Sequence, residues 1–189
     1  MSAPKILVIP GSARKASLNK KLAAIAAERA RLAGAEVRLI DLNDYPAPIY
    51  HGDEEAEHGL PESMRRLKAD IRAHDAMIIA TPEYNGHVPP LLVNAFDWVS
   101  RAEGEDKSNA FEGKLAGIMA ASPGRLGGAR VLPRLRAFLA DLGVMSVPGF
   151  ASLPGAMTGF DEDGRLTDER VIAQIDTLVT KLMAQLTRG

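Results

Sequence analysis

The sequence predicts an α/β fold in which one parallel sheet carries helices on both faces. Strand and helix signals alternate along the chain, which is typical of a doubly wound parallel sheet. The first strand signal, Ile6–Ile9, is apolar at every position and therefore fits a strand that is buried on both faces. A chain of 189 residues is long enough for one extended core, so we expect a single domain spanning residues 1–189.

Five strands are expected, because five short apolar runs are bounded by helix or turn signals. These runs cover residues 5–9, 36–40, 76–80, 115–121 and 144–147. We expect a sheet of order 2-1-3-4-5. In such a sheet a ligand binds beyond the carboxyl ends of strands one and three, where the strand order reverses.

Five helices are expected, because apolar residues recur at spacings of three and four between and after the strands. The expected helices begin near Ser17 and near Pro61, span 90–101 and 131–142, and run through 171–186 behind Thr167 as a cap. The segment 44–59 breaks this rhythm with prolines, glycines and acids around two histidines. We interpret it as a long functional or covering loop.

The composition indicates an ordinary globular protein without an electrostatic preference for nucleic acid or membranes. Hydrophobic residues make up 46% and charged residues 25%, and the net charge is −1. There is no cysteine, which excludes disulfides and thiolate chemistry, and the four histidines lack metal-ligand spacing, so we predict no metal site. The N-terminus lacks signal-peptide features and no apolar run is long enough to span a bilayer, so we expect a cytoplasmic protein.

Residues 10–19 have the features of an anion-binding loop. They follow the first strand and lead directly into a helix, whose N-terminus offers unpaired N–H groups and the positive end of a dipole. Arg14 and the side chains of Ser12, Ser17 and Asn19 add further donors, so a phosphate is the expected guest. A simpler alternative is that Ser17 only caps the helix and that Arg14 is a solvated loop residue.

Two further loops should border the same edge of the sheet. Residues 81–90 follow the third strand, and they are polar, stiffened by prolines and carry the aromatic Tyr84. Residues 122–128 follow the fourth strand, and their three glycines allow close backbone approach to a ligand or a positive φ. The three loops together predict a mononucleotide site, although Tyr84 alone would also fit a surface or packing aromatic.

Other nucleotide sites are disfavoured. The chain has no Walker motif, and only Gly11 stands where a dinucleotide fingerprint needs three glycines, so we interpret Asp41 as a loop or capping acid. The predicted crevice has no nucleophile paired with a base, and His87 is its one histidine. We therefore expect no catalytic side chain and a ligand, such as a flavin, that carries the redox step.

Two motifs in these loops carry a family resemblance. Gly11-Ser12-x-Arg14-x-x-Ser17-x-Asn19 resembles the phosphate loop, and Pro82-Glu83-Tyr84-Asn85-Gly86 with Asn94-Ala95-Phe96-Asp97-Trp98-x-Ser100 resembles the second signature, of the NADPH-dependent FMN reductases. That family has a flavodoxin-like fold, a three-layer sandwich, and includes quinone, azo-dye and chromate reductases. The resemblance runs from about Lys5 to the last helix.

The resemblance implies FMN as the cofactor, NADPH or NADH as the electron donor, and a quinone, free flavin, azo compound or chromate as the small-molecule acceptor. It implies that the FMN phosphate is held by Ser12, Arg14, Ser17, Leu18 through its backbone, and Asn19. It implies that the isoalloxazine ring is lined by Pro82, Glu83, Tyr84, Asn85 and Gly86, with Ser122 and Gly124 closing its other edge.

Two alternative functions stay open. A flavodoxin-like electron carrier would bind FMN without reacting with nicotinamides, but such carriers tend to be strongly acidic and this chain is nearly neutral. A phosphate-binding module would have no redox role at all.

The expected third helix bears on assembly. Its apolar residues occupy more of its circumference than one sheet face requires, and they are Leu91, Leu92, Val93, Phe96, Trp98 and Val99. A deeply buried helix would explain the pattern equally well, whereas the resemblance implies a homodimer or homotetramer formed through this region. Val93 and Pro90 depart from the lysine and glycine common in the family, which affects interface or substrate details.

Overall fold

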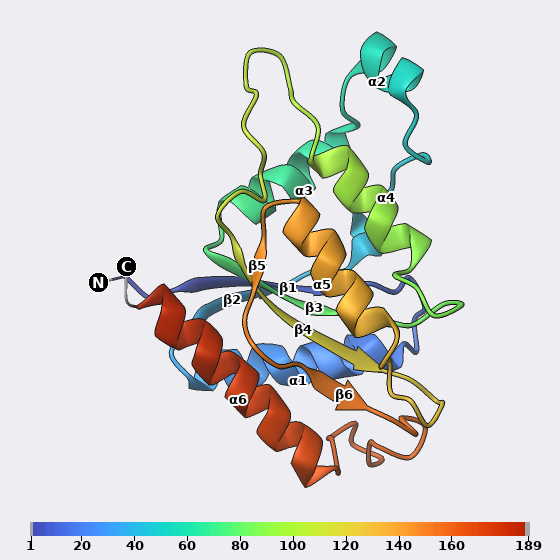
Figure 1. The fold of residues 1–189 in the computed structure, drawn as a ribbon, viewed down its shortest axis with the longest axis vertical. Coiled ribbons are helices and arrows are strands. Elements are labelled where there is room, and N and C mark those ends of the chain that lie inside the picture. The colour runs from blue at the N-terminus through green and yellow to red at the C-terminus, as the bar shows by residue number, and fades with distance from the viewer. Residues whose placement is uncertain (1, 188–189) are drawn as a thin grey trace.

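The central sheet of the computed structural model confirms the predicted strand order. The structure describes residues 2–187. The strands are β1 (Lys5–Pro10), β2 (Glu36–Leu39), β3 (Ala76–Ala80), β4 (Leu115–Ala121), β5 (Met145–Ser146) and β6 (Ala151–Leu153). All pair in parallel, in the order β2-β1-β3-β4-β5, with β6 also pairing with β4 (Figure 1).

The last edge of the sheet is interrupted, which the sequence did not predict. β5 pairs with the start of β4 through Leu115–Met145, and β6 pairs with its end through Ala121–Leu153. Between them lie Pro148 and a glycine with a φ of 95° at position 149, and neither a proline nor a positive φ fits a ladder. β6 therefore delivers the chain to the same edge of the sheet at which β4 ends.

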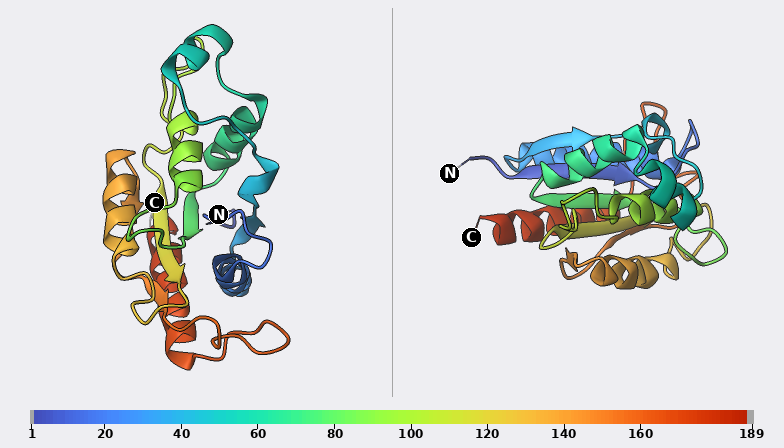
Figure 2. Two further views of the ribbon diagram at one scale, coloured as in Figure 1. Left: turned by 90° about the vertical axis from the view of Figure 1, so that its right-hand side faces the viewer. Right: turned by 90° about the horizontal axis from the view of Figure 1, so that it is seen from above.

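The helices lie on both faces of the sheet as predicted (Figure 2). Those described are α1 (Leu18–Leu32), α2 (Gly52–His58), α3 (Glu62–Arg72), α4 (Pro90–Val99), α5 (Val131–Asp141) and α6 (Glu169–Leu186). Leu7 and Ile9 of β1 pack in the core beneath α3, α4 and α5, whereas Ile6 and Val8 pack in the core beneath α1 and α6. Both faces of the strand are buried, which explains its continuous apolar run.

The predicted cap of the last helix is wrong by one residue. Asp168, and not Thr167, is the N-cap of α6, and its Oδ1 accepts a hydrogen bond from the Val171 N–H at 3.2 Å. The helix begins one residue later than expected, so the carboxylate of Asp168 is the group that reaches the third N–H of the helix.

The segment predicted as a loop is only partly irregular. It contains α2, and a 3₁₀ turn over Leu42–Asp44 precedes it. The His51 Nδ1 accepts a hydrogen bond from the Asp53 N–H at 3.3 Å, and the acids of the first turn complement the positive end of the helix. No residue of α2 is buried, so the helix has no apolar periodicity from which it could be predicted.

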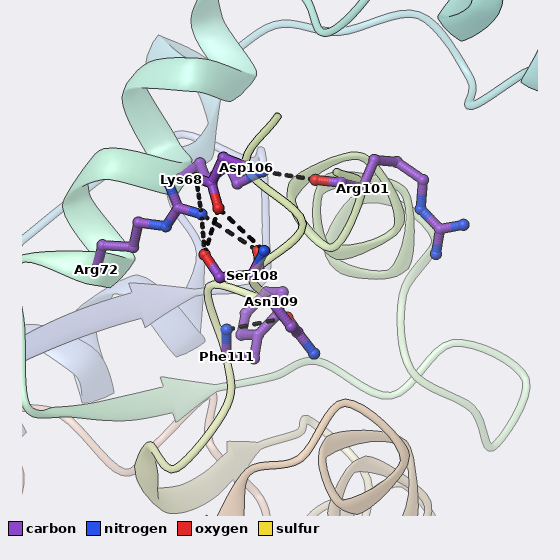
Figure 3. A network of polar contacts seen from close by, with 7 residues as sticks. All are labelled: Lys68, Arg72, Arg101, Asp106, Ser108, Asn109 and Phe111. Atoms are coloured by element: carbon purple, nitrogen blue, oxygen red, sulfur yellow. Dashed lines mark hydrogen bonds and ion pairs between the residues drawn. The ribbon is translucent and has the colours of Figure 1, made fainter. Parts of the chain in front are cut away.

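A polar network ties the loop after α4 to α3 (Figure 3). The buried Lys68 Nζ donates to the Arg101 carbonyl at 2.5 Å, and Arg72 pairs with Asp106 at 2.6 Å. Hydrogen bonds to Asp106 lower the pKa of its carboxyl to about 2. The largest contributions come from the Ser108 hydroxyl and N–H, and a smaller one comes from Arg72. This loop and α2 project from the same end of the molecule (Figures 1 and 2), so the network holds one of the two projections in place.

Candidate active site

A cavity of about 90 Å³ gathers most of the predicted binding residues. It lies where the loop before α1, the loop after β3 and the loop after β4 meet, which is the predicted reversal point of the sheet. Its predicted lining residues are Ser12, Arg14, Ser17, Leu18, Asn19, Pro82, Glu83, Tyr84 and Ser122. Asn85, Gly86 and Gly124 lie outside this lining, and Ala121 and Pro123 line it without having been predicted.

The loop before α1 presents buried hydroxyl groups to the cavity. Ser12 is 3% exposed and Ser17 is 5% exposed. Ser17 is the N-cap of α1 and accepts a hydrogen bond from the Lys20 N–H at 3.3 Å, while the Ser12 Oγ accepts one from the Arg14 N–H at 3.4 Å. Each hydroxyl keeps its own proton as a donor, and the first-turn N–H groups of α1 have no carbonyl partner within the helix. This donor set, with Arg14 beside it, fits a phosphate group.

Asn19 joins the phosphate loop to the sheet. Its Nδ2 donates to the Ala121 carbonyl at 2.9 Å, and its Oδ1 accepts from the Ala121 N–H at 2.8 Å, across 102 residues of sequence. The side chain is therefore held to the end of β4 through both its nitrogen and its oxygen. What Asn19 can offer an anion is its backbone N–H in the first turn of α1.

The loop after β3 is a tight hairpin. Tyr84 and His87 exchange backbone hydrogen bonds of 3.2 and 2.9 Å, and the two residues between them, Asn85 and Gly86, have φ values of 53° and 75°. This is the geometry of a two-residue type I′ turn, for which Asn-Gly is the favoured pair, so the sequence held a signal that our prediction did not use. Tyr84 is 44% exposed and lines the cavity, which places it at the mouth.

The carboxylate of Glu83 is directed to α5. Its side chain is 8% exposed and accepts hydrogen bonds from the N–H groups of Arg130 and Val131 at 3.2 and 3.1 Å and from the Arg130 Nε at 2.8 Å. Arg134, one turn further along α5, donates to the Gly86 carbonyl. Sequence reasoning missed both arginines, although the absence of a capping side chain or an acid at the start of α5 was a signal.

The loop after β4 is held by the chain that follows β6. The Ser122 Oγ accepts from the Gly124 N–H at 3.1 Å, and the Ser122 and Gly124 carbonyls accept from Ala156 and Gly155 at 3.0 and 3.2 Å. A Cβ at Gly127 would lie 2.4 Å from the Ser152 Oγ, so this glycine is required by close packing against β6. The loop is therefore fixed before any ligand binds.

The model of the NADPH-dependent FMN reductases matches residues 4–158. The chain belongs to this family. It is 37% identical over 166 residues to a quinone reductase of Pseudomonas putida, covering 87% of this chain and 85% of the relative. It is 38% identical over 170 residues to an NAD(P)H-dependent FMN reductase of Pseudomonas aeruginosa, covering 88% and 86%.

A solved structure supports the same assignment. The NAD(P)H:acceptor oxidoreductase FerB of Paracoccus denitrificans superimposes with a TM-score of 0.82 at 29% identity, covering 98% of both chains. The flavodoxin-like fold is confirmed, and the protein is an FMN-dependent oxidoreductase that uses NAD(P)H.

In this FMN reductase Asp41 supports the phosphate loop and does not resemble a ribose-binding acid. It caps the 3₁₀ turn by accepting from the Asn43 N–H at 3.0 Å, and it pairs with Lys20 of α1 at 2.5 Å, so the capping interpretation is confirmed. Burial favours the neutral acid, but hydrogen bonds from Lys20 and Asn43 outweigh it and lower the pKa of Asp41. The Asn43 side chain also donates to the Ala13 carbonyl at 2.8 Å.

The second family signature holds the segment before α2. Asn94 Nδ2 and Trp98 Nε1 each donate to the Pro48 carbonyl at 2.9 Å, and the Asn94 Oδ1 accepts from the Tyr50 N–H at 2.7 Å. The Tyr50 and Trp98 rings meet edge to face, with centroids 5.1 Å apart. This part of the signature therefore acts through the scaffold, away from the cavity.

A groove of about 380 Å³ lies beside this contact. It is lined by Ile49, Tyr50, Pro90, Leu91, Val93, Asn94 and Asp97. Leu92, Phe96, Trp98 and Val99 are buried in the core, whereas Leu91 and Val93 are half-buried and Ile49 is 86% exposed. The excess apolar surface of α4 is thus open at this groove.

Residues 2–187 contain no group of three or more His, Asp or Glu side chains placed to hold a metal ion. They also contain no helix with the length and apolar character needed to cross a membrane.

Proposed function

We propose that this reductase passes electrons from NAD(P)H through FMN bound in the cavity to a small planar acceptor such as a quinone. The observation that carries the proposal is that the phosphate loop, the hairpin after β3 and the loop after β4 line one cavity. When bound there, FMN supplies hydride acceptance and electron release. The protein supplies binding, orientation and fixed charge.

The phosphate would bind at the N-terminus of α1. The hydroxyls of Ser12 and Ser17, the backbone N–H groups of Leu18 and Asn19, and the Arg14 guanidinium are the donors that face this position. Charge-assisted hydrogen bonds are stronger than neutral ones, so Arg14 should contribute most of the preference for a phosphate over an uncharged tail.

The ring would bind between the hairpin and the loop after β4. Backbone groups of residues 82–86 would face its polar edge, with Ser122 and Gly124 at the other edge. Backbone donors held rigidly in this way can stabilise negative charge on a reduced ring without any side chain acting as an acid or base. Tyr84, exposed at the mouth, leaves room for the nicotinamide and the acceptor to approach in turn.

The groove beside α4 supports a homodimer, with a homotetramer as the alternative. The exposed Ile49 and the half-buried Leu91 and Val93 line the same groove, and apolar patches of this kind favour association. Sedimentation velocity should show more than one chain per particle for the wild type, and Ile49→Asp should shift the distribution to the monomer. A monomeric wild type would contradict this part of the proposal.

The fold and composition also support one domain over residues 1–189 and a cytoplasmic location, for which the absence of cysteine is the supporting observation.

Flavin retention and steady-state kinetics test the proposed function. The purified protein, incubated with FMN, should keep flavin absorbance through gel filtration and oxidise NADPH or NADH when given a quinone, free FMN, an azo dye or chromate. Values of kcat/KM for both nicotinamides across these acceptors would rank them. A colourless protein that oxidises neither nicotinamide would refute the proposal. Flavin binding without nicotinamide oxidation would support an electron carrier.

A further inference from the structure

We propose that Glu83 and Arg134 are positioning residues, which together fix the ring-facing hairpin of the FMN site from the first turns of α5. The inference rests on the proposed binding of the ring against residues 82–86. It assigns to Glu83 a role different from a direct contact of its carboxylate with the flavin, and it adds a residue, Arg134, that lies outside the cavity lining.

The first tie is the cap of α5. The residue at the N-cap position, Arg130, has a helical backbone and makes no side-chain cap, and no acid occupies the first turn. Glu83, from a loop 47 residues earlier, acts as the capping side chain: its Oε2 accepts hydrogen bonds from the N–H groups of Arg130 and Val131, and its Oε1 accepts one from the Arg130 Nε. A carboxylate that is 8% exposed and bonded on both oxygens would have to break these hydrogen bonds to turn toward a ligand.

The second tie holds the tip of the hairpin. The Arg134 Nη1 donates to the Gly86 carbonyl, and a Cβ at Gly86 would stand 2.9 Å from the same nitrogen. Glu83 immediately precedes the turn and Gly86 is one of its two central residues, so the hairpin is bonded to α5 at its base and at its tip. The hairpin therefore has the orientation that α5 imposes, and the backbone groups it presents to the cavity have that orientation too.

Loss of either tie should weaken binding of the flavin ring and leave binding of the phosphate unchanged. Riboflavin has the ring of FMN without the phosphate, so the affinities of the two ligands separate the two halves of the site. Arg134→Ala should weaken FMN and riboflavin by the same factor, about tenfold or less for the loss of one hydrogen bond that orients a neighbour. It should also shift the reduction potential of the bound flavin and lower kcat more than it changes KM for the nicotinamide.

The matched control is Arg136→Ala. Arg136 lies on the same helix, and its Nη2 donates at 2.8 Å to the Gly149 carbonyl of the β5–β6 connection, so the substitution removes the same chemical group from a bond to a different loop. It should leave both flavin affinities and the potential as in the wild type. Arg134→Lys, which keeps a donor, should recover part of the loss.

Glu83 is tested by Glu83→Gln, which keeps the volume and one acceptor, and by the double variant with Arg130→Ala. If the carboxylate acts through α5, the effects of the two substitutions on riboflavin affinity should be less than additive. A Glu83→Gln protein that unfolds more easily but binds riboflavin with unchanged affinity and potential would overturn the inference, as would unchanged flavin properties in Arg134→Ala. If the wild type bound neither flavin, the proposed function itself would fail, so the two failures are distinguishable.

Discussion

The phosphate loop and the ring-facing hairpin reach the same cavity by different physical means. The phosphate loop takes its shape mainly from its own neighbours: Ser17 caps the helix it precedes, and the Ser12 hydroxyl bonds two residues ahead. The hairpin has a locally favoured turn, but its orientation depends on Glu83 and Arg134 bonding to α5. Anion binding is thus encoded over a few residues, whereas placement of the ring is decided by contacts between distant segments.

Asn19 makes the buried long-range contacts of the phosphate loop, and its substitution should give the largest effect. Asn19→Ala would leave the N–H and carbonyl of Ala121 without partners in a buried position, at a cost of about 2–4 kcal/mol of unfolding free energy. Urea unfolding measures this loss. Asn43→Ala, which removes an exposed bond to the Ala13 carbonyl, should cost about 1 kcal/mol or less, and equal losses would show that the loop has no special tie to β4.

Arg14→Ala tests the claim that the phosphate loop binds the anion through residues close in sequence. The Kd for FMN should rise about ten- to hundredfold, because a charge-assisted hydrogen bond to the phosphate is lost, while the Kd for riboflavin should not change. Flavin fluorescence titration measures both. Lys15→Ala removes an equal charge from the next residue of the exposed loop and should have little effect. A similar rise in the Kd for riboflavin would show that Arg14 contacts the ring and not the phosphate.

Gly86→Ala tests the claim that contacts with α5 set the orientation of the ring-facing hairpin. A non-glycine residue at its φ of 75° costs about 1–2 kcal/mol, and the added Cβ would also press on Arg134. Gly164→Ala is the control, since Gly164 has a φ of 81° and nothing within 4 Å of the added Cβ. Thermal unfolding should show a larger loss for Gly86→Ala, together with weaker riboflavin binding. Identical losses would mean that Arg134 does not restrain the turn.

Acidic pH should have the smallest effect on stability, and it should act through Asp106, which lies outside the phosphate loop and the hairpin. The pKa of Asp106 is about 2 in the folded protein, below its usual 3.8, so its stabilising contribution is present above pH 3.8 and is lost as the pH falls toward 2. Asp106→Asn should flatten the decline of Tm over this range. Glu105→Gln, at a neighbouring exposed acid that forms no ion pair with any residue of 2–187, should leave the slope unchanged. Equal slopes for wild type and Asp106→Asn would contradict the lowered pKa of Asp106, which the hydrogen bonds from Ser108 and then Arg72 produce.

Features that depend on local sequence patterns were predicted, whereas features that depend on contacts between distant segments were not. The strands at 76–80 and 115–121 were predicted with their observed ends, because strands buried on both faces have an unmistakable apolar run. α2 was missed because no side chain of it is buried, and β6 was missed because a bend at Pro148 separates it from β5. The predicted site residues gathered as expected at the edge of the sheet, but their separate roles could not be read from the motif. The side chains of Glu83 and Asn19 line the cavity, but their functional groups bond to distant backbone.

The sequence by itself determined the alternation of strands and helices that is typical of a parallel sheet, and it determined the anion-binding loop, because apolar periodicity and helix capping act over a few neighbouring residues. Only the tertiary structure decided that Glu83 caps α5, that Asn19 joins α1 to β4 and that the fifth strand divides in two. These contacts join segments 47 and 102 residues apart or depend on a bend in the chain, and no local pattern specifies which distant groups will meet.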